Sequence, residues 1–140
     1  MGVCEWLEQV RKLDELIDAK LAERDKLWAM ATSVTVDSDG MPHAKGNVSD
    51  PVGNAAVKLR MLAEEIDRLI DVYVEHKEQV IRALEKLPHN EYGVMHRHYI
   101  RYMTWEDVAE DMGYSTVQIW RLKKNALKIL QDVIECKAIK

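Results

Sequence analysis

Cationic and polar side chains gather in one stretch of the chain, from Tyr114 to Lys128. The stretch carries Arg121, Lys123, Lys124 and Lys128 and no acidic residue, although the 140-residue chain has a formal net charge of −4. Guanidinium and ammonium groups bind phosphates, and screening confines the field of such a basic strip to about 10 Å. Charge alone leaves two interpretations, a phosphate-binding strip and an ordinary solvated helix face.

The residues around this strip have helix-turn-helix spacing. Ala109 supplies the small residue needed where two helices cross, and Gly113, four positions later, tolerates the positive φ of a tight turn. Ser115 can cap the second helix. The apolar positions that would fill a small core between the helices are Val108, Met112, Tyr114, Ile119 and Leu122. The alternative is an ordinary helical hairpin with a glycine turn.

If Ile119 and Leu122 face the core, the helical period of 3.6 residues determines which side chains of the last helix face outward. In a helix-turn-helix, side chains on this face enter the major groove of DNA. A glutamine such as Gln118 can bond an adenine edge twice, and an arginine such as Arg121 can do the same with guanine. The candidate DNA-binding residues are Ser115, Thr116, Val117, Gln118, Arg121, Lys123, Lys124 and Lys128.

The lysines and Trp120 have other expected roles. Lys123, Lys124 and Lys128 are expected to meet phosphates, which position a protein on DNA without reading its sequence. Trp120 is expected at the edge of the small core, with a contact to the sugar-phosphate backbone as the alternative.

A second basic cluster precedes this segment and consists of His96, Arg97, His98 and Arg101. His96 and His98 are two positions apart on a helix, so they point to different sides and cannot share a metal ion. Contact with backbone phosphates and a solvated surface are both consistent with this cluster.

Residue patterns of common catalytic and metal sites are missing from the sequence. There is no Gly-rich phosphate loop, His-Glu-x-x-His motif or nucleophile elbow. Cys4 and Cys136 lie near opposite ends of the chain and have no zinc-ligand spacing, so we expect two free thiols, or a disulfide if the fold brings the ends together. We therefore expect no enzymatic activity, no cofactor and no metal.

Composition and periodicity predict an all-α protein. Only nine residues are Gly or Pro, and 47% are apolar. Apolar residues recur at helical spacing from Val3 to about Ala31 and from about Pro51 to Lys86. The residues expected to share the face of the first helix are Trp6, Val10, Leu13, Ile17, Leu21 and Trp28. We expect a long antiparallel, coiled-coil-like helical hairpin from these two helices.

The second helix carries a heptad seam. Its members are Leu59, Ile66, Tyr73, Val80 and Leu87, with Leu62, Leu69 and Ala83 between them and His76 as a polar interruption. The seam can pack on the first helix or on another copy of the chain, and we favour a dimer. Residues 32–50 between the helices, in which Val34 and Val36 alternate, predict either a short β-hairpin or a long mobile loop.

Three helices are expected after Pro88. Asn90 is expected to cap the first, over residues 91–102, and Thr104 to cap the second, which ends at Gly113. Ser115 would cap the last helix, running to about Cys136. We thus expect a hairpin at 1–87 for oligomerisation and a three-helix, helix-turn-helix domain at 88–140. Residues 1–87 carry 12 basic and 17 acidic side chains, and residues 88–140 carry 8 and 7.

From Leu87 to Leu130 the chain resembles region four of the sigma-seventy family. The resemblance lies in Leu-Pro, Arg-His-Tyr-Ile, Thr-Trp-Glu-Asp-Val-Ala, Gly-Tyr-Ser and Ile-Trp-Arg-Leu-Lys-Lys. The Tyr-Ser turn and the preceding long helices are similar to small phage and prophage transcriptional regulators of the ArpU/RinA type. The loop Arg101-Tyr102-Met103 departs from region four, because it lacks the glycine often found there.

This resemblance implies a DNA-binding activator of phage late genes, with double-stranded DNA as its partner and RNA polymerase as a further candidate partner. Two other functions stay open: DNA recognition in packaging, as in a small terminase subunit, and a protein-interaction module that does not touch DNA. No apolar run is long enough to span a membrane, so we expect a cytoplasmic protein in a bacterial host.

Overall fold

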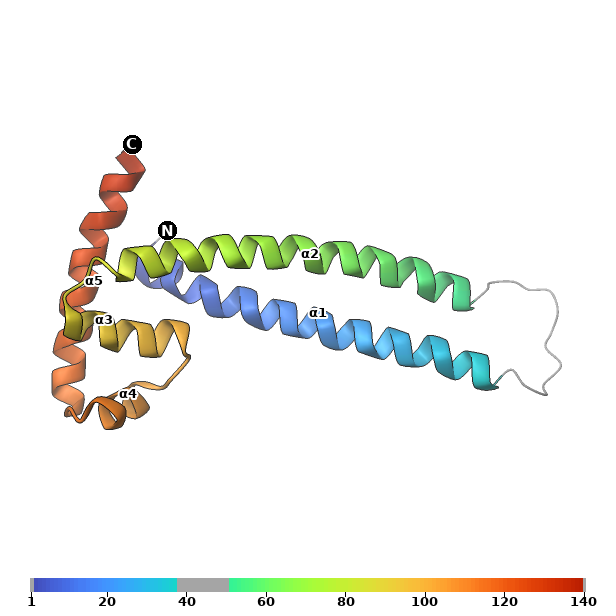
Figure 1. Ribbon diagram of the computed structural model, residues 1–140, viewed down its shortest axis with the longest axis horizontal. Helices are drawn as coiled ribbons and strands as arrows, with labels where there is room; N and C mark the ends of the chain where they lie inside the picture. Colours follow the sequence, from blue (N-terminus) through green and yellow to red (C-terminus); the bar gives the residue numbers. More distant parts are fainter. Residues whose placement is uncertain (1, 38–50, 140) are drawn as a thin grey trace. The chain divides into compact units, whose positions relative to one another are not determined.

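The computed structural model describes residues 2–37 and 51–139, with side chains placed for residues 2–32 and 53–135. Its elements are α1 (Val3–Asp37), α2 (Pro51–Leu84), α3 (His89–Met95), a π-helical turn η1 (His96–Ile100), α4 (Trp105–Met112) and α5 (Thr116–Ile139) (Figure 1). The described residues form no strand, which confirms the predicted all-α class. None of the helices in this part of the chain has an apolar stretch of the length that a membrane span needs.

Helix α1 continues past the predicted end at Ala31 and reaches Asp37. The Thr32 hydroxyl donates to the backbone oxygens of Trp28 and Ala29, at 3.1 and 3.0 Å, so its polar group is satisfied inside the helix. Val34 and Val36 therefore belong to a helix, and the predicted β-hairpin at these positions is wrong. The rest of the predicted loop, residues 38–50, lies outside the described residues.

Two boundaries near Pro88 also differ from prediction. Helix α2 ends at Leu84 rather than Lys86, because the N–H groups of Lys86 and Leu87 turn back to carbonyls only three residues away. Helix α3 begins at His89, with Pro88 in an extended conformation at the N-cap and its carbonyl accepting from the Tyr92 N–H. Asn90 thus lies inside the first turn and does not cap the helix, contrary to prediction.

The described chain forms two compact units. Unit 1 comprises Met1–Asp14 and Tyr73–Lys140, and unit 2 comprises Glu15–Val72. This division differs from the expected boundary after Leu87. The difference arises because the first turns of α1 and the last turns of α2 share a core with the helices that follow them.

The core of unit 1 joins residues that are far apart in the sequence. Leu7, Val10, Val80 and Leu84 are fully buried together with Met95 of α3. The remaining buried members of this cluster are Val3, Ala83, Leu87, Tyr99, Ala126 and Leu130. Because α5 contributes Ala126 and Leu130, the second half of α5 is held by this core while its first half extends to α4.

His76, the polar interruption of the heptad seam, has a structural role in unit 1. Its Nε2 lies 2.7 Å from the backbone oxygen of Trp6, and the two rings meet edge to face at 5.5 Å. A carbonyl only accepts, so this contact requires a proton on Nε2. The hydrogen bond fixes the register of α2 against the start of α1.

Unit 2 consists of antiparallel segments of α1 and α2 that lie side by side (Figure 1). Lys20 and Glu65 form an ion pair of 3.2 Å between them. Ile17, Leu62 and Ile66 are buried. The predicted contact face of α1 does not extend to Trp28, whose side chain is 62% exposed.

Most of the heptad seam is covered within the chain. Val80, Ala83 and Leu87 are buried in unit 1, and Leu62 and Ile66 in unit 2. The seam therefore serves contacts inside one chain, the first of the two predicted uses.

Tyr102 has an unusual backbone conformation, with φ of 59°. It follows η1, where the Arg101 N–H reaches back to the His96 oxygen at 3.1 Å, and it occupies the loop in which the sequence lacks a glycine. Its hydroxyl donates to Asp14 Oδ2 at 2.7 Å, and the guanidinium of Arg11 lies 5.5 Å from its ring centre. These contacts offset the steric cost of a side chain in the left-handed region.

Replacing a residue by alanine usually leaves a protein more stable than replacing it by glycine. At Tyr102 we expect the opposite order. Both Tyr102→Ala and Tyr102→Gly lose the Asp14 hydrogen bond, but only glycine adopts positive φ without strain. Tyr102→Gly should be more stable than Tyr102→Ala by about 1 kcal/mol in urea unfolding. An alanine variant as stable as the glycine variant would contradict the assigned backbone conformation.

Candidate nucleic-acid interface

The turn between α4 and α5 is defined by backbone hydrogen bonds at both of its ends. The Thr104 hydroxyl accepts from the Asp107 N–H at 3.1 Å and caps α4 as predicted. Gly113 ends α4 in the left-handed conformation, with φ of 72°, also as predicted. The N–H groups of Gly113 and Tyr114 bond the Glu110 and Ala109 carbonyls at 3.3 and 2.9 Å, which is the Schellman arrangement.

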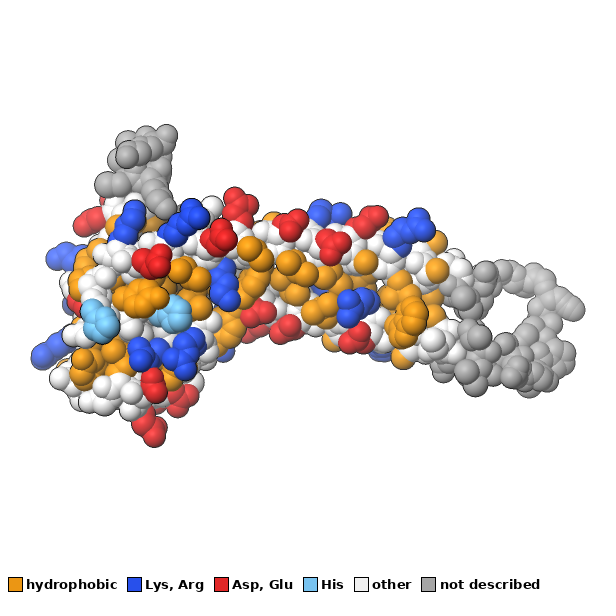
Figure 2. Space-filling view, viewed as in Figure 1, with side chains coloured by type: hydrophobic (Ala, Val, Ile, Leu, Met, Phe, Trp, Pro, Cys, Tyr) orange, Lys and Arg blue, Asp and Glu red, His pale blue; other side chains and the backbone are white. Residues whose placement is uncertain are grey.

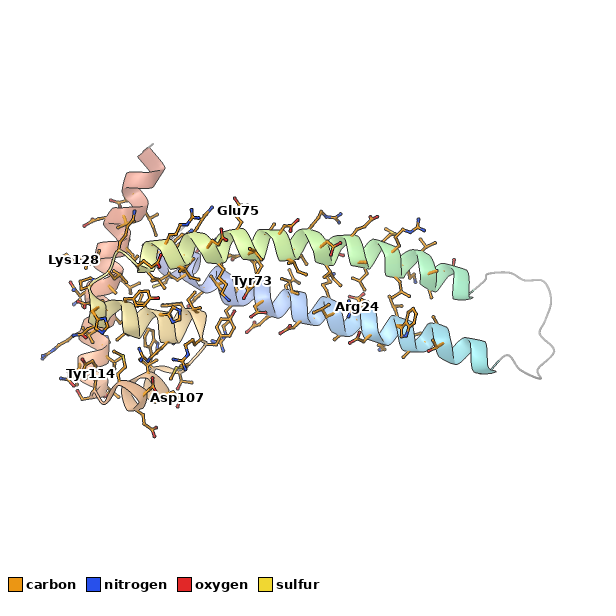
Figure 3. The ribbon with its side chains drawn as sticks, in the orientation of Figure 1. Arg24, Tyr73, Glu75, Asp107, Tyr114 and Lys128 are labelled. Carbon is orange, nitrogen blue, oxygen red and sulfur yellow. The ribbon has the colours of Figure 1, made fainter. Side chains whose placement is uncertain are left out.

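A small apolar core lies behind this turn. Val94 of α3, Val108 and Ala109 of α4, and Ile119 of α5 are buried together. The partly buried side chains that pack against them are Met103, Trp105, Met112, Tyr114 and Leu122. The five apolar residues that the sequence assigned to this core therefore all contribute to it, and Figure 3 shows Tyr114 in the turn.

Gly93 permits close packing of α3 on α4, a role that sequence analysis missed. A Cβ atom at this position would lie 3.0 Å from Arg97 Nη1 and 3.1 Å from Met112 Cε. Both distances are tighter than ordinary van der Waals contact. The available signal was a glycine inside a short helix, three residues before the first member of the basic cluster, His96.

Ser115 and Gln118 form a reciprocal cap at the start of α5. The Ser115 hydroxyl accepts from the Gln118 N–H at 3.2 Å, and Gln118 Oε1 accepts from the Ser115 N–H at 2.9 Å. The Ser115 cap was predicted, whereas the part played by the Gln118 side chain was not. This capping box holds the Gln118 amide against the turn, so paired bonding to an adenine edge would require that amide to turn away from Ser115.

The outer face of the first half of α5 is open to solvent. Ser115, Thr116, Gln118, Arg121 and Lys124 are all exposed. Val117 is 56% exposed, and Lys128 is exposed farther along the same helix (Figure 3). Arg121 makes no ion pair with another described residue, so its guanidinium is available to an external acceptor.

Two lysines of this segment lie over tryptophan rings. Lys123 is half-buried, with its Nζ 4.7 Å from the ring centre of Trp105, and Lys124 Nζ lies 5.0 Å from that of Trp120. Trp120 is 58% exposed, so its predicted place at the edge of the core is wrong. It lies outward because Ile119 occupies the inward position one residue earlier.

A shallow hollow of about 150 Å³ opens beside the start of α5. Trp105, Thr116, Ile119, Trp120 and Lys123 line it. Its wall is mainly aromatic and aliphatic, with the Lys123 ammonium on one side. Such a hollow can take an apolar group that carries or adjoins a negative charge.

The second basic cluster is largely occupied by internal contacts. Arg97 Nε donates to Asp111 Oδ2 at 2.6 Å, and its Nη1 donates to the Gly93 oxygen at 3.1 Å. His96 is half-buried and its ring lies 5.4 Å from that of Tyr92, so Arg101 is the exposed member of the cluster. Arg97 and His96 thus already have partners inside unit 1, and a phosphate contact of the cluster stays a prediction.

His98 connects η1 to α4. Its ring stacks on Trp105 with centres 3.7 Å apart and planes 13° from parallel. Its Nδ1 lies 2.7 Å from the Met103 carbonyl and therefore carries the proton. Burial lowers the pKa of His98, and the nearby Lys123 adds to this effect, whereas the Met103 hydrogen bond opposes it.

A partly buried polar contact joins α3 to α5. Asn125 Nδ2 donates to Glu91 Oε2 at 2.6 Å, and Glu91 is the buried acid among the described residues of unit 1. Sequence analysis missed this pair because Glu91 and Asn125 are 34 residues apart and each lies on a polar position of its own helix.

The remaining chemistry of the described residues is sparse. Cys4 is an exposed free thiol, and the side chain of Cys136 lies outside the described residues. No group of three or more His, Cys, Asp or Glu side chains in the described part of the chain could hold a metal ion.

When compared with known proteins, the chain matches no family model, no curated protein and no solved structure.

We expect acid to destabilise the fold through His98. Its lowered pKa keeps the native imidazole neutral at pH values where the unfolded imidazole, with a pKa near 6.5, takes up a proton. This contribution to stability is full above about pH 6.5 and is lost as the pH falls toward the native pKa. His96, whose pKa burial also lowers, acts in the same direction.

Urea unfolding between about pH 5 and 7 measures this effect. His98→Phe keeps a ring on Trp105 but cannot titrate, so the free energy of unfolding should depend less on pH than in the parent protein. His89→Gln, at an exposed position, is the control. An unchanged pH dependence in His98→Phe would contradict the assigned role.

Proposed function

We propose that the protein is a sequence-specific double-stranded DNA-binding regulator of transcription. In this proposal α3–η1, α4 and α5 form a helix-turn-helix module that follows a helical hairpin of α1 and α2 in the chain. The first turns of α5 enter the major groove. The observation that carries the proposal is that the exposed face of α5 from Thr116 to Lys128 has cations and no acid, while its inner face is fixed by the small core.

The contacts of α5 assign different tasks to its side chains. Arg121 is the leading candidate for reading a base, because it is exposed and makes no ion pair with another described residue. Val117 offers an apolar surface for a thymine methyl group. Lys124 and Lys128 are suited to phosphates, which bring affinity rather than specificity.

The acidic residues of α4 limit where DNA can bind. Glu106, Asp107 and Glu110 are exposed on α4, and the Asp111 carboxylate is paired with Arg97. The favourable surface for a polyanion is thus narrow and follows α5. This charge distribution supports insertion of one helix rather than a broad electrostatic contact.

The resemblance to phage and prophage regulators supports transcription as the process in which DNA is bound. It further suggests activation of late genes. Packaging of DNA, as by a small terminase subunit, would use the same DNA-reading surface, so Arg121 is the first residue to test under either process.

Replacing Arg121 by alanine should weaken binding to the preferred DNA sequence by about 1–3 kcal/mol, because a paired hydrogen bond to a base edge is lost. The sequence can be selected from a random duplex pool with the parent protein, and affinity measured by fluorescence anisotropy. Arg82→Ala removes the same charge from an exposed position of α2 and should leave affinity unchanged. Equal effects of the two variants would contradict base reading by Arg121.

The salt dependence of affinity tests the phosphate contacts separately. Removing one phosphate contact should reduce the slope of log affinity against log salt by about 0.9. We expect this change for Lys124→Ala and for Lys128→Ala, with little effect on sequence preference. Lys86→Ala, at an exposed position two residues after the end of α2, is the matched control. Slopes that remain at the parent value would exclude these lysines from the interface.

A protein contact through α5 is the second candidate function, favoured by the hollow beside Trp120. An acidic, apolar segment of RNA polymerase would suit its lining and the adjacent Lys123 ammonium. Trp120→Ala should then abolish transcription activation while leaving DNA affinity intact, whereas a DNA contact at Trp120 would lower both.

A further inference from the structure

Unit 2 buries little apolar surface for its size. Among its described residues, the buried apolar side chains are Ile17, Leu62 and Ile66. Its exposed large apolar side chains are Leu16, Trp28, Met30, Val57, Met61, Ile70 and Val72. Figure 2 shows apolar side chains at the surface along the segments of α1 and α2 that form this unit. Large exposed apolar patches are typical of surfaces that contact another molecule.

Part of this surface forms one stripe along α2. Val57, Met61, Glu64, Arg68 and Val72 are spaced by three or four residues, so at 100° per residue they fall within about 80° of one another. Val57, Met61 and Val72 are 60%, 63% and 51% exposed. The buried Leu62 and Ile66 lie on a different side of the helix. The stripe is therefore a second face of α2, and it is exposed among the described residues of unit 2.

The charges beside the stripe have a symmetrical arrangement. Glu64 and Arg68 lie at equal distances on either side of Ile66 in the sequence. Two further pairs, Arg60 with Asp71 and Met61 with Val72, have midpoints within one residue of Ile66. An antiparallel copy of α2, placed with its own Ile66 at this level, sets Glu64 against Arg68, Arg60 against Asp71 and Met61 against Val72. A parallel copy would instead set like charges side by side.

We propose that this stripe of α2 binds the same stripe of a second copy of the chain, antiparallel, about a twofold axis near Ile66. Apolar contacts of Met61 with Val72 of the partner copy provide the attraction, and the reciprocal Glu64–Arg68 pairs set the register and orientation. The contact is isologous, as in most homodimers. The stripe from Val57 to Val72 is roughly 25 Å long.

Two single variants with reversed charge test the pairing. In a dimer of Arg68→Glu, positions 64 and 68 of the two copies face each other with two carboxylates. In a dimer of Glu64→Arg, the same positions face each other with two guanidinium groups. Each variant alone should associate at least about tenfold more weakly than the parent in sedimentation velocity, with unchanged helix content by circular dichroism. An equimolar mixture of the two should recover the dimer, because in a mixed dimer both facing pairs join a carboxylate to a guanidinium group.

Recovery in the mixture separates a contact between chains from an effect within one helix. Glu23→Arg, at an exposed position of α1, is the matched control and should associate as the parent does. The proposal is overturned if the parent is monomeric at micromolar concentration, if the single variants associate as strongly as the parent, or if the mixture stays monomeric.

Disulfide trapping tests the orientation. In a chain with Cys4→Ser and Cys136→Ser, a mixture of Met61→Cys and Val72→Cys should cross-link efficiently, whereas Met61→Cys alone should not. Efficient cross-linking of Met61→Cys alone would overturn the antiparallel arrangement. None of these measurements uses DNA, so their outcome and that of the proposed DNA binding are independent.

Discussion

The short turn between α4 and α5 is the constraint on which the proposed reading surface depends. Gly113 adopts a positive φ, the Schellman hydrogen bonds close α4, and Ser115 and Gln118 cap α5 in both directions. With the turn fixed in this way, Ile119 must face the small core, and Thr116, Val117 and Arg121 must face solvent. Rotation of α5 about its axis would break these contacts, so the identity of the exposed face follows from the turn.

Much of this local structure could be predicted from the sequence because its signals are local. Thr104 and Ser115 precede helices as capping residues, and Gly113 marks the left-handed turn. The small core also follows from helical spacing. Trp120 was placed wrongly because an aromatic residue next to an inward position suggests burial, whereas the helix period directs it outward and a cation covers part of its ring.

Features that depend on contacts between distant segments could not be predicted in the same way. The hydrogen bond of Tyr102 to Asp14 spans 88 positions and accompanies a backbone conformation that composition gives no reason to expect at tyrosine. His76 interrupts the apolar heptad seam in the sequence, but in the structure it forms a hydrogen bond with the backbone oxygen of Trp6. The ion pair of Arg97 with Asp111, 14 positions away, likewise gives an internal partner to a cation for which the sequence alone indicated none.

The central claim is that the exposed face of α5 is where DNA binds. The most direct measurement follows backbone amide shifts of isotope-labelled protein as a random-sequence duplex is added at low salt, where nonspecific binding is strong. If α5 binds DNA, the largest shifts fall on residues 115–124, with small shifts on the segments of α1 and α2 in unit 2. No shifts, or shifts concentrated outside α5 and its turn, would contradict this claim.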